Sequence, residues 1–287
     1  MKKVLTFLLA AAMLLSLVSC AGASSQTQTS AAESETAAET ETMPQAEDDA
    51  FIESIRSRGY LIAGCKMDVK GLSYHDASTD TWSGLEIEIA YMTAAKIFGV
   101  SLNEAKEKEL VHFVGVTVAD REAVLEKGDI DVMLATYTIT EARAERFALS
   151  ESYYKDYIGL MVRYSGENLN SLGTGEIRST ADLDGKNVAV AKNSTTREDM
   201  IAFLNTMSSN SVNPMFFEYA SYESMFKALK DGTVDVMSVD VSILNNYVDS
   251  ETQILGDRFA GQNYGAAVLP DHASLLTYVN QAIDDIS

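Results

Sequence analysis

Short apolar runs alternate with longer amphipathic segments through residues 51–287. The short runs favour strands, and the longer segments repeat their apolar residues at helical spacing. In the first half the expected strands are 59–64, 110–115 and 130–135, and the expected helices are 83–99 and 117–131. Strands separated by helices imply right-handed crossovers, so we expect an α/β fold with mainly parallel sheets.

The expected helices carry start and stop signals. Ser83 precedes the first apolar residue of its helix and belongs to a residue type preferred as N-cap, while Gly99 follows the last apolar residue. The helix at 117–131 is expected to close at Gly128 and to lead directly into the next strand.

The second half repeats this order. A strand is expected at 155–164, a strand that turns into a helix at 183–207, and a strand, helix, strand and helix at 215–248. The segments "LEKGDIDVM" and "LKDGTVDVM" echo each other, which suggests two similar α/β lobes. We expect lobe 1 at 51–155 with 249–287, lobe 2 at 156–248, and a ligand in the cleft between them, beyond the carboxyl ends of the strands.

Polar side chains follow the apolar strand 130–135. Thr136 and Thr138 alternate, so on a strand they would point to one side, and Arg143 comes soon after. A guanidinium group offers a rigid fork that matches a carboxylate in two parallel hydrogen bonds. Hydroxyls and a guanidinium at the end of a strand therefore predict a site for an anion.

The first twenty residues predict export. Lys2 and Lys3 precede an apolar stretch that is typical of a signal peptide, and at about fifteen residues it is shorter than the roughly 20 that span a membrane. The stretch ends in "LVSC", which resembles a bacterial lipobox with Cys20 as the acylated residue; the alternative is an ordinary secretory signal. Residues 21–50 are small, polar and acidic, so we expect a disordered tether behind a membrane lipid anchor at the extracytoplasmic face.

Charge, cysteine count and histidine spacing argue against several classes of function. The formal charge of -20 argues against nucleic acid as a partner. If Cys20 carries lipid, Cys65 is left without a disulfide partner. The three histidines are scattered, and no catalytic triad or phosphate-binding loop is apparent, so no metal, cofactor or catalytic residue is expected.

Four segments together resemble bacterial extracellular solute-binding proteins of family 3, the receptors of ABC importers for polar amino acids. They are "TWSGLEIEIAYMTAAKIFG", "LEKGDIDVMLATYTITEARAERFALSESYY", "LDGKNVAVAKNSTT" and "DGTVDVMSVD". The resemblance implies a two-lobed fold of the type II periplasmic-binding-protein kind with a two-strand hinge. It also implies a monomer that captures an amino acid and delivers it to an ABC permease and its ATPase.

Within that family the chain most resembles the aspartate- and glutamate-binding branch, through "VTVADREAVLEKG", "SVDVSIL" and "GQNYGAAV". Alternatives are a receptor for glutamine, cystine or another polar amino acid, or a sensor or adhesin on the same scaffold. An enzyme is a weaker alternative, because no added acid or base pair is seen in these segments.

The resemblance also assigns roles to residues. Arg143 would hold the ligand α-carboxylate beside Thr138, and Asp240 the α-ammonium group, although Asp240 also fits a helix N-cap. The remaining expected ligand-binding residues are Ser194 and Thr195 at a helix start, Arg121 and Lys66 for a ligand side-chain carboxylate, Tyr222 at the pocket edge, and Thr136 as the weakest candidate.

Two departures from the family pattern concern the pocket. Asn193 replaces a common glycine, and asparagine tolerates the left-handed backbone that the turn requires. The segment 68–74, "DVKGLSY", lacks the proline and aromatic residue that many relatives place there, and Lys70, Gly71 and Leu72 take their place in the pocket wall.

Overall fold

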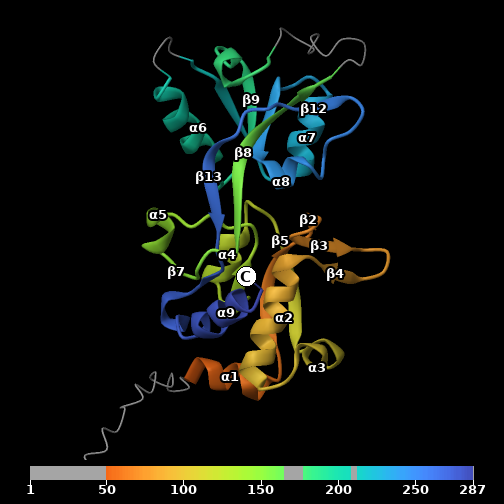
Figure 1. Cartoon of the computed structure of the whole chain (residues 1–287), viewed down its shortest axis with the longest axis vertical. Helices are drawn as coiled ribbons and strands as arrows, with labels where there is room; N and C mark the ends of the chain where they lie inside the picture. Colours follow the sequence, from red (N-terminus) through yellow and green to blue (C-terminus); the bar gives the residue numbers. More distant parts are fainter. Residues whose placement is uncertain (1–49, 165–176, 208–211, 287) are drawn as a thin grey trace, which may run out of the picture. The chain divides into compact units, whose positions relative to one another are not determined.

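The computed structural model describes residues 50–164, 177–207 and 212–286 (Figure 1). The predicted signal peptide, Cys20 and the predicted tether up to residue 49 lie outside the described residues, whereas Ala50 begins a helix. Among the residues that are described, no helix combines the length and apolar character needed to cross a membrane.

The first sheet has five strands in the order β5-β1-β6-β14-β7. Its strands are β1 (Leu61–Lys66), β5 (Val111–Val116), β6 (Val132–Leu134), β7 (Ala148–Leu149) and β14 (Ala267–Val268). β1 pairs in parallel with β5 and β6, which confirms the parallel arrangement expected for these three strands. β14 returns from the end of the chain and pairs antiparallel with β6 and β7.

Helices cover this sheet and supply its core. They are α1 (Ala50–Arg58), α2 (Leu85–Phe98), α3 (Leu102–Glu107), α4 (Arg121–Glu126), α5 (Glu141–Ala144), the short η2 (Pro270–His272) and α9 (Leu275–Asp284). Ile87 and Ile89 of α2 pack with Leu61 of β1 and Val279 of α9 in one buried cluster. Burying such side chains contributes about 1.5–3 kcal/mol each, which fixes α2 on the sheet.

The second sheet has the order β10-β9-β11-β8-β12, with β13 also paired to β8. Its strands are β8 (Tyr154–Arg163), β9 (Asn187–Ala191), β10 (Met215–Tyr219), β11 (Val236–Asp240), β12 (Thr252–Ile254) and β13 (Phe259–Tyr264). β9, β10 and β11 are parallel, whereas β8, β12 and β13 are antiparallel to their neighbours. The accompanying helices are η1 (Thr180–Asp182), α6 (Thr196–Asn205), α7 (Tyr222–Lys230) and α8 (Val241–Leu244).

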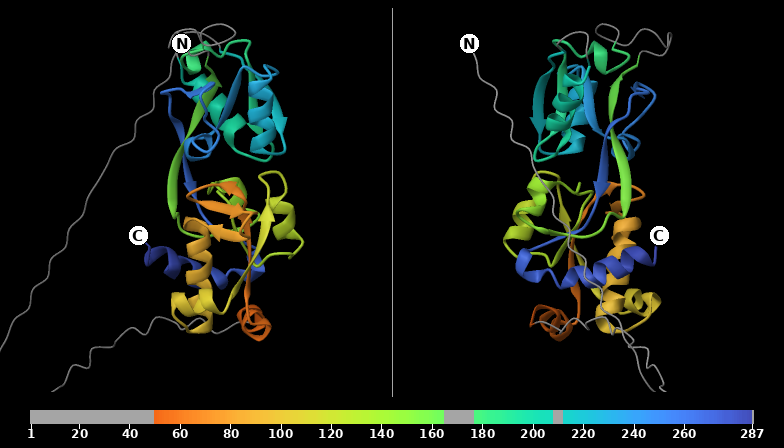
Figure 2. Two further views of the ribbon diagram at one scale, coloured as in Figure 1. Left: turned by 90° about the vertical axis from the view of Figure 1, so that its right-hand side faces the viewer. Right: turned by 60° about the vertical axis from the view of Figure 1, so that its left-hand side comes forward.

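β8 and β13 connect the two halves of the fold. They pair along Tyr154–Tyr264 to Ile158–Phe259 and lie side by side in both views of Figure 2. The lobe boundaries stay a prediction, but because β12 and β13 hydrogen-bond to β8, the strand pairing favours grouping residues 252–264 with the second sheet.

A three-stranded sheet precedes α2 and corrects the expected helix start. Its strands are β2 (Asp68–Val69), β3 (Ser73–Asp76) and β4 (Thr81–Ser83). Ser83 therefore ends a strand, and Gly84, with φ 118°, is the N-cap of α2. A Cβ at Gly84 would lie 2.3 Å from the Leu72 carbonyl oxygen, so only glycine fits there. The helix end agrees with the prediction, because Gly99 adopts the left-handed conformation at φ 65°.

Candidate functional site

Thr136 occupies an unusual position just beyond β6. Its φ of 48° is uncommon for a β-branched residue, so the simple strand alternation expected for Thr136 and Thr138 is wrong. The Thr136 N–H donates to Glu86 Oε1 at 2.6 Å, and its carbonyl accepts from Arg121 Nη1 at 3.0 Å. Arg121 also donates to the Ala135 carbonyl, so two buried ionisable side chains hold this turn in place.

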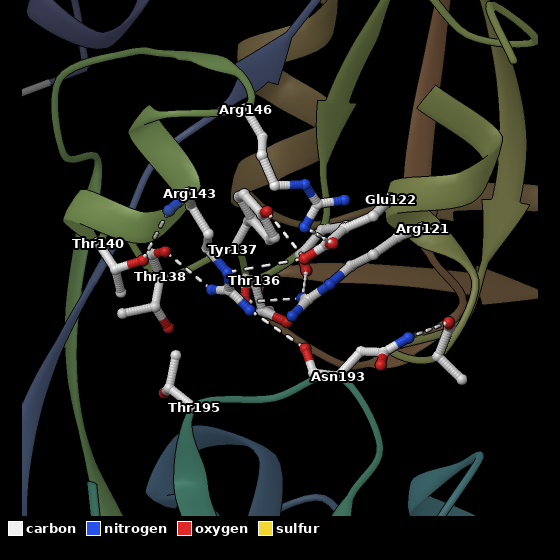
Figure 3. A network of polar contacts seen from close by, with 12 residues as sticks. Arg121, Glu122, Thr136, Tyr137, Thr138, Thr140, Arg143, Arg146, Asn193 and Thr195 are labelled. Atoms are coloured by element: carbon white, nitrogen blue, oxygen red, sulfur yellow. Dashed lines mark hydrogen bonds and ion pairs between the residues drawn. The ribbon is translucent and has the colours of Figure 1, made fainter. Parts of the chain in front are cut away.

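Arg143 lies against the same turn, on the short helix α5. Its Nη1 donates to the Thr138 carbonyl at 2.8 Å, and its Nη2 donates to the Asn193 carbonyl at 3.2 Å. The guanidinium group stacks 3.9 Å from the centroid of the Tyr137 ring, and Figure 3 shows it pointing toward Arg121. Arg143 is 7% exposed, and burial together with Arg121 lowers its pKa to about 10, so it stays cationic at neutral pH.

Thr138, which follows β6, and Thr195, which precedes α6, meet at one amide. Both hydroxyls donate to Gln262 Oε1, at 2.6 and 3.0 Å respectively. Gln262 lies on β13, is 2% exposed, and donates through Nε2 to Asp199 at 2.9 Å. Each hydroxyl has one proton, which it donates to Gln262. Toward any other group, each hydroxyl oxygen can therefore act only as an acceptor, through its lone pairs.

The turn before α6 follows the prediction in part. Asn193 adopts φ 61°, so asparagine does replace glycine in a left-handed turn, and its Nδ2 donates to the Ala119 carbonyl at 2.7 Å. The helix begins at Thr196 with Thr195 as N-cap, although the Thr195 side chain makes no capping bond. The Ser194 hydroxyl donates to the Ala191 carbonyl at 2.7 Å, so its proton is engaged within the turn and is not available to a ligand.

Asp240 ends β11 and is buried. It sits at the N-cap position of α8 without a side-chain capping bond, and its carboxylate accepts instead from the Tyr264 hydroxyl. Asp156 of β8 takes the capping role, because its Oδ2 accepts from the Ser242 N–H at 3.0 Å. Burial raises the pKa of Asp240 to about 7; the Tyr264 hydrogen bond opposes this shift and the charge of Asp156 adds to it.

Lys66 and Tyr222 are brought together from the two halves of the fold. Lys66 ends β1, and its Nζ lies 4.0 Å from the centroid of the Tyr222 ring and 3.2 Å from Asp68 Oδ1. Burial is the main cause that lowers the pKa of Lys66, and the charge of Asp68 opposes it. Lys66 is 1% and Arg121 2% exposed, so both cations are buried rather than solvated at the surface.

One buried cluster therefore holds most of the expected ligand-binding residues, and four further members were missed. The missed residues are Glu86, Asp156, Gln262 and Tyr264. Glu86, Gln262 and Tyr264 each form a hydrogen bond with an expected residue, and Asp156 accepts from the Ser242 N–H in α8, the helix that follows Asp240. Within the described residues, no three His, Cys, Asp or Glu side chains gather so as to hold a metal ion. The cluster offers opposite charges and hydroxyls, which suit a small polar zwitterion.

Comparisons with known proteins agree with this fold. The profile of "Bacterial extracellular solute-binding proteins, family 3" matches residues 61–287. The chain is 31% identical over 265 residues to a glutamine-binding protein of Geobacillus stearothermophilus, covering 90% of this chain and 89% of the relative. It is 23% identical over 236 residues to the glutamate-binding protein GluB of Corynebacterium efficiens, covering 79% and 74%.

A solved structure shows the same fold. The holo form of the T. maritima protein ArgBP superposes with a TM-score of 0.64 at 23% sequence identity, covering 82% of this chain and 93% of that one. A family match over most of the described residues, together with this two-sheet architecture, confirms the resemblance seen in the sequence. The chain belongs to the bacterial extracellular solute-binding proteins of family 3.

Proposed function

We propose that this protein binds a free amino acid and delivers it to an ABC importer. The observation that carries the proposal is that buried opposite charges come from the two halves of the fold: Arg143 lies on α5, which follows β6 of the first sheet, and Asp240 ends β11 of the second. These charges suit the α-carboxylate and the α-ammonium group of an amino acid. The relatives whose names state an amino-acid ligand support the same class of solute.

The hydroxyls of Thr138 and Thr195 fit this arrangement. Because both donate to Gln262, each presents an acceptor, and an ammonium group needs acceptors. We assign Arg143 to the ligand α-carboxylate, and Asp240 with Thr138 and Thr195 to the α-ammonium group. Thr136 and Ser194 make contacts within their own turns, so we assign them supporting roles.

For the ligand side chain we propose a carboxylate, as in glutamate or aspartate. Lys66 and Arg121 are buried cations, with Lys66 against the ring of Tyr222, and both would attract an anionic group. Glutamine is the second candidate. Lys66 already pairs with Asp68 at 3.2 Å, and the relative at 31% identity is named as a glutamine-binding protein.

The mechanism that we propose is hinge closure. Hydrogen bonds already join the two halves, among them Lys70 N–H to Asn246, Tyr247 hydroxyl to Asp68, and Asn193 Nδ2 to the Ala119 carbonyl. Such exposed or half-buried bonds each contribute about 1 kcal/mol, so alone they hold the closed state weakly. A ligand that contacts both sheets would shift the population toward it.

The position at the membrane is also a proposal. The lipobox-like "LVSC" supports acylation of Cys20, and the acidic stretch 21–50 would tether the binding domain near a permease. A sensor that binds without transport shares these features. Radiolabelled uptake in cells that lack this chain separates the two: loss of import supports delivery, and unchanged import contradicts it.

Calorimetric titration of the purified protein against the twenty amino acids tests the binding proposal. We expect micromolar affinity, about -8 kcal/mol, for glutamate, aspartate or glutamine. Absence of heat and of thermal stabilisation with every amino acid would contradict it. Chemical turnover of a bound amino acid would instead support an enzyme.

A further inference from the structure

A buried carboxylate on α2 has no role in the binding scheme above. Glu86 is 0% exposed, and carboxylates are rarely buried without a specific reason. Its Oε1 accepts from the Thr136 N–H at 2.6 Å and from the Tyr153 hydroxyl. Its Oε2 is also buried and has no hydrogen-bond partner among the described residues, so half of this carboxylate is available for another interaction.

Glu86 lies beside the two cations that we assign to the ligand side chain. Arg121 donates to the carbonyl of Thr136, and Glu86 accepts from the N–H of the same residue. Both side chains therefore form hydrogen bonds with the backbone of Thr136. Lys66 and Arg121 both act electrostatically on Glu86, and Glu86 acts in return on Lys66. Arg121 Nε is a further buried group without a hydrogen-bond partner among the described residues.

The charges at this end of the cluster balance. Lys66 and Arg121 are matched by Asp68 and by an ionised Glu86, so a ligand carboxylate would add an unmatched negative charge. If Glu86 is neutral, one positive charge is left for the ligand. Buried charges interact strongly because the effective dielectric constant is lower than in water, so a single charge changes the outcome.

We propose that Glu86 determines the preference of this site between acidic and neutral ligand side chains, because its carboxylate competes with the ligand for Lys66 and Arg121. This inference rests on the proposed amino-acid site. When Glu86 is ionised the site favours glutamine, and when Glu86 is neutral it favours glutamate. Binding of glutamate therefore favours the protonated form of Glu86.

The effect of pH on Glu86 has to be distinguished from its effect on the other titratable groups that face this carboxylate. Cys65 and Lys66 come from β1, Arg121 from α4, and Tyr153 from the segment before β8. Burial raises the pKa of the Cys65 thiol and of the Tyr153 phenol well above their ordinary values, so both stay neutral between pH 6 and 8. Burial likewise raises the pKa of Glu86 and lowers that of Lys66. The experiment must therefore show which of these two residues causes a change of ligand preference with pH.

Glu86→Gln is the direct test, since glutamine keeps an oxygen that accepts from Thr136 and Tyr153 but removes the charge. The dissociation constants for glutamate and glutamine are measured by calorimetry at pH 7. We expect the ratio of the glutamine to the glutamate constant to rise at least tenfold. Glu88→Gln is the matched control, because Glu88 lies on the same helix and pairs outward with Lys106 at 2.6 Å, and it should leave the ratio unchanged.

The wild-type protein provides a second readout that does not depend on the variant folding. As the pH is lowered through the raised pKa of Glu86, the ratio should shift toward glutamate, while effects on Asp240 cancel because both ligands share the α-ammonium group. The shift should vanish in Glu86→Gln. A pH-independent ratio in the wild type, or a shift that persists in the variant and so belongs to Lys66, would overturn the inference. Binding of neither amino acid by the wild type would overturn the proposed site itself.

Discussion

The titration of Asp240 gives a quantitative prediction for ligand affinity. Its pKa is raised to about 7, chiefly by burial and further by the charge of Asp156. Only the ionised carboxylate can pair with a ligand ammonium group. Lowering the pH through 7 therefore removes the binding-competent form of the free protein, and affinity should rise with pH and level off above about 8.

The size of the effect follows from that pKa. At pH 8 about 90% of Asp240 is ionised, and at pH 6 about 10%, so the dissociation constant should increase about tenfold between these values, equivalent to about 1.4 kcal/mol. Glutamine is the suitable ligand, because its side chain is uncharged and does not titrate.

The assay is calorimetric titration with glutamine at pH 6, 7 and 8 in buffers of different ionisation heat, which also counts the protons released on binding. Asp240→Asn should bind weakly and without this dependence. A wild-type affinity that is constant from pH 6 to 8, with no proton release, would show that Asp240 does not bind the ammonium group.

Two further predictions concern single residues. Arg143→Ala should weaken binding of every amino acid at least about 100-fold, since two charge-assisted hydrogen bonds of roughly 1.5–3 kcal/mol each are lost. Arg146→Ala is its control, because Arg146 pairs at the surface with Glu122 and Glu126, and comparable losses in both variants would contradict the role of Arg143. Gly84→Ala should lower the unfolding free energy by about 2 kcal/mol or more in urea denaturation, because its Cβ would collide with Leu72. Gly99→Ala, also at positive φ but with no atom within 4 Å of its Cβ, should cost about 1 kcal/mol, and equal costs would contradict the collision.

The sequence predicted the elements whose signals are local. Strands β1, β5 and β6 and the left-handed Gly99 follow directly from apolar runs and a closing glycine. Ser83 was wrongly predicted as the N-cap of α2, because a residue type that is preferred as N-cap can also end a strand. The small sheet β2-β3-β4 was missed, since its strands are two to four residues long and carry little periodicity.

The residues of the candidate site likewise divide into those that could be identified from the sequence and those that could not. Arg143, Thr138 and Asp240 could be singled out because their chemistry and order along the chain resemble a family pattern. Gln262 and Glu86 could not, because their roles come from partners far away in the sequence, such as Thr138 and Thr136. A charged residue on the buried side of α2 was the one available signal for Glu86.

The central claim is that opposite charges from the two sheets, Arg143 and Asp240, bind the two charged groups of a free amino acid. Calorimetry with glutamine and with two analogues, one lacking the α-ammonium group and one lacking the α-carboxylate, tests it most directly. We predict that the amino acid binds and that each analogue loses at least about 100-fold in affinity. Retained binding of either analogue, within a few-fold of the amino acid, would contradict the claim.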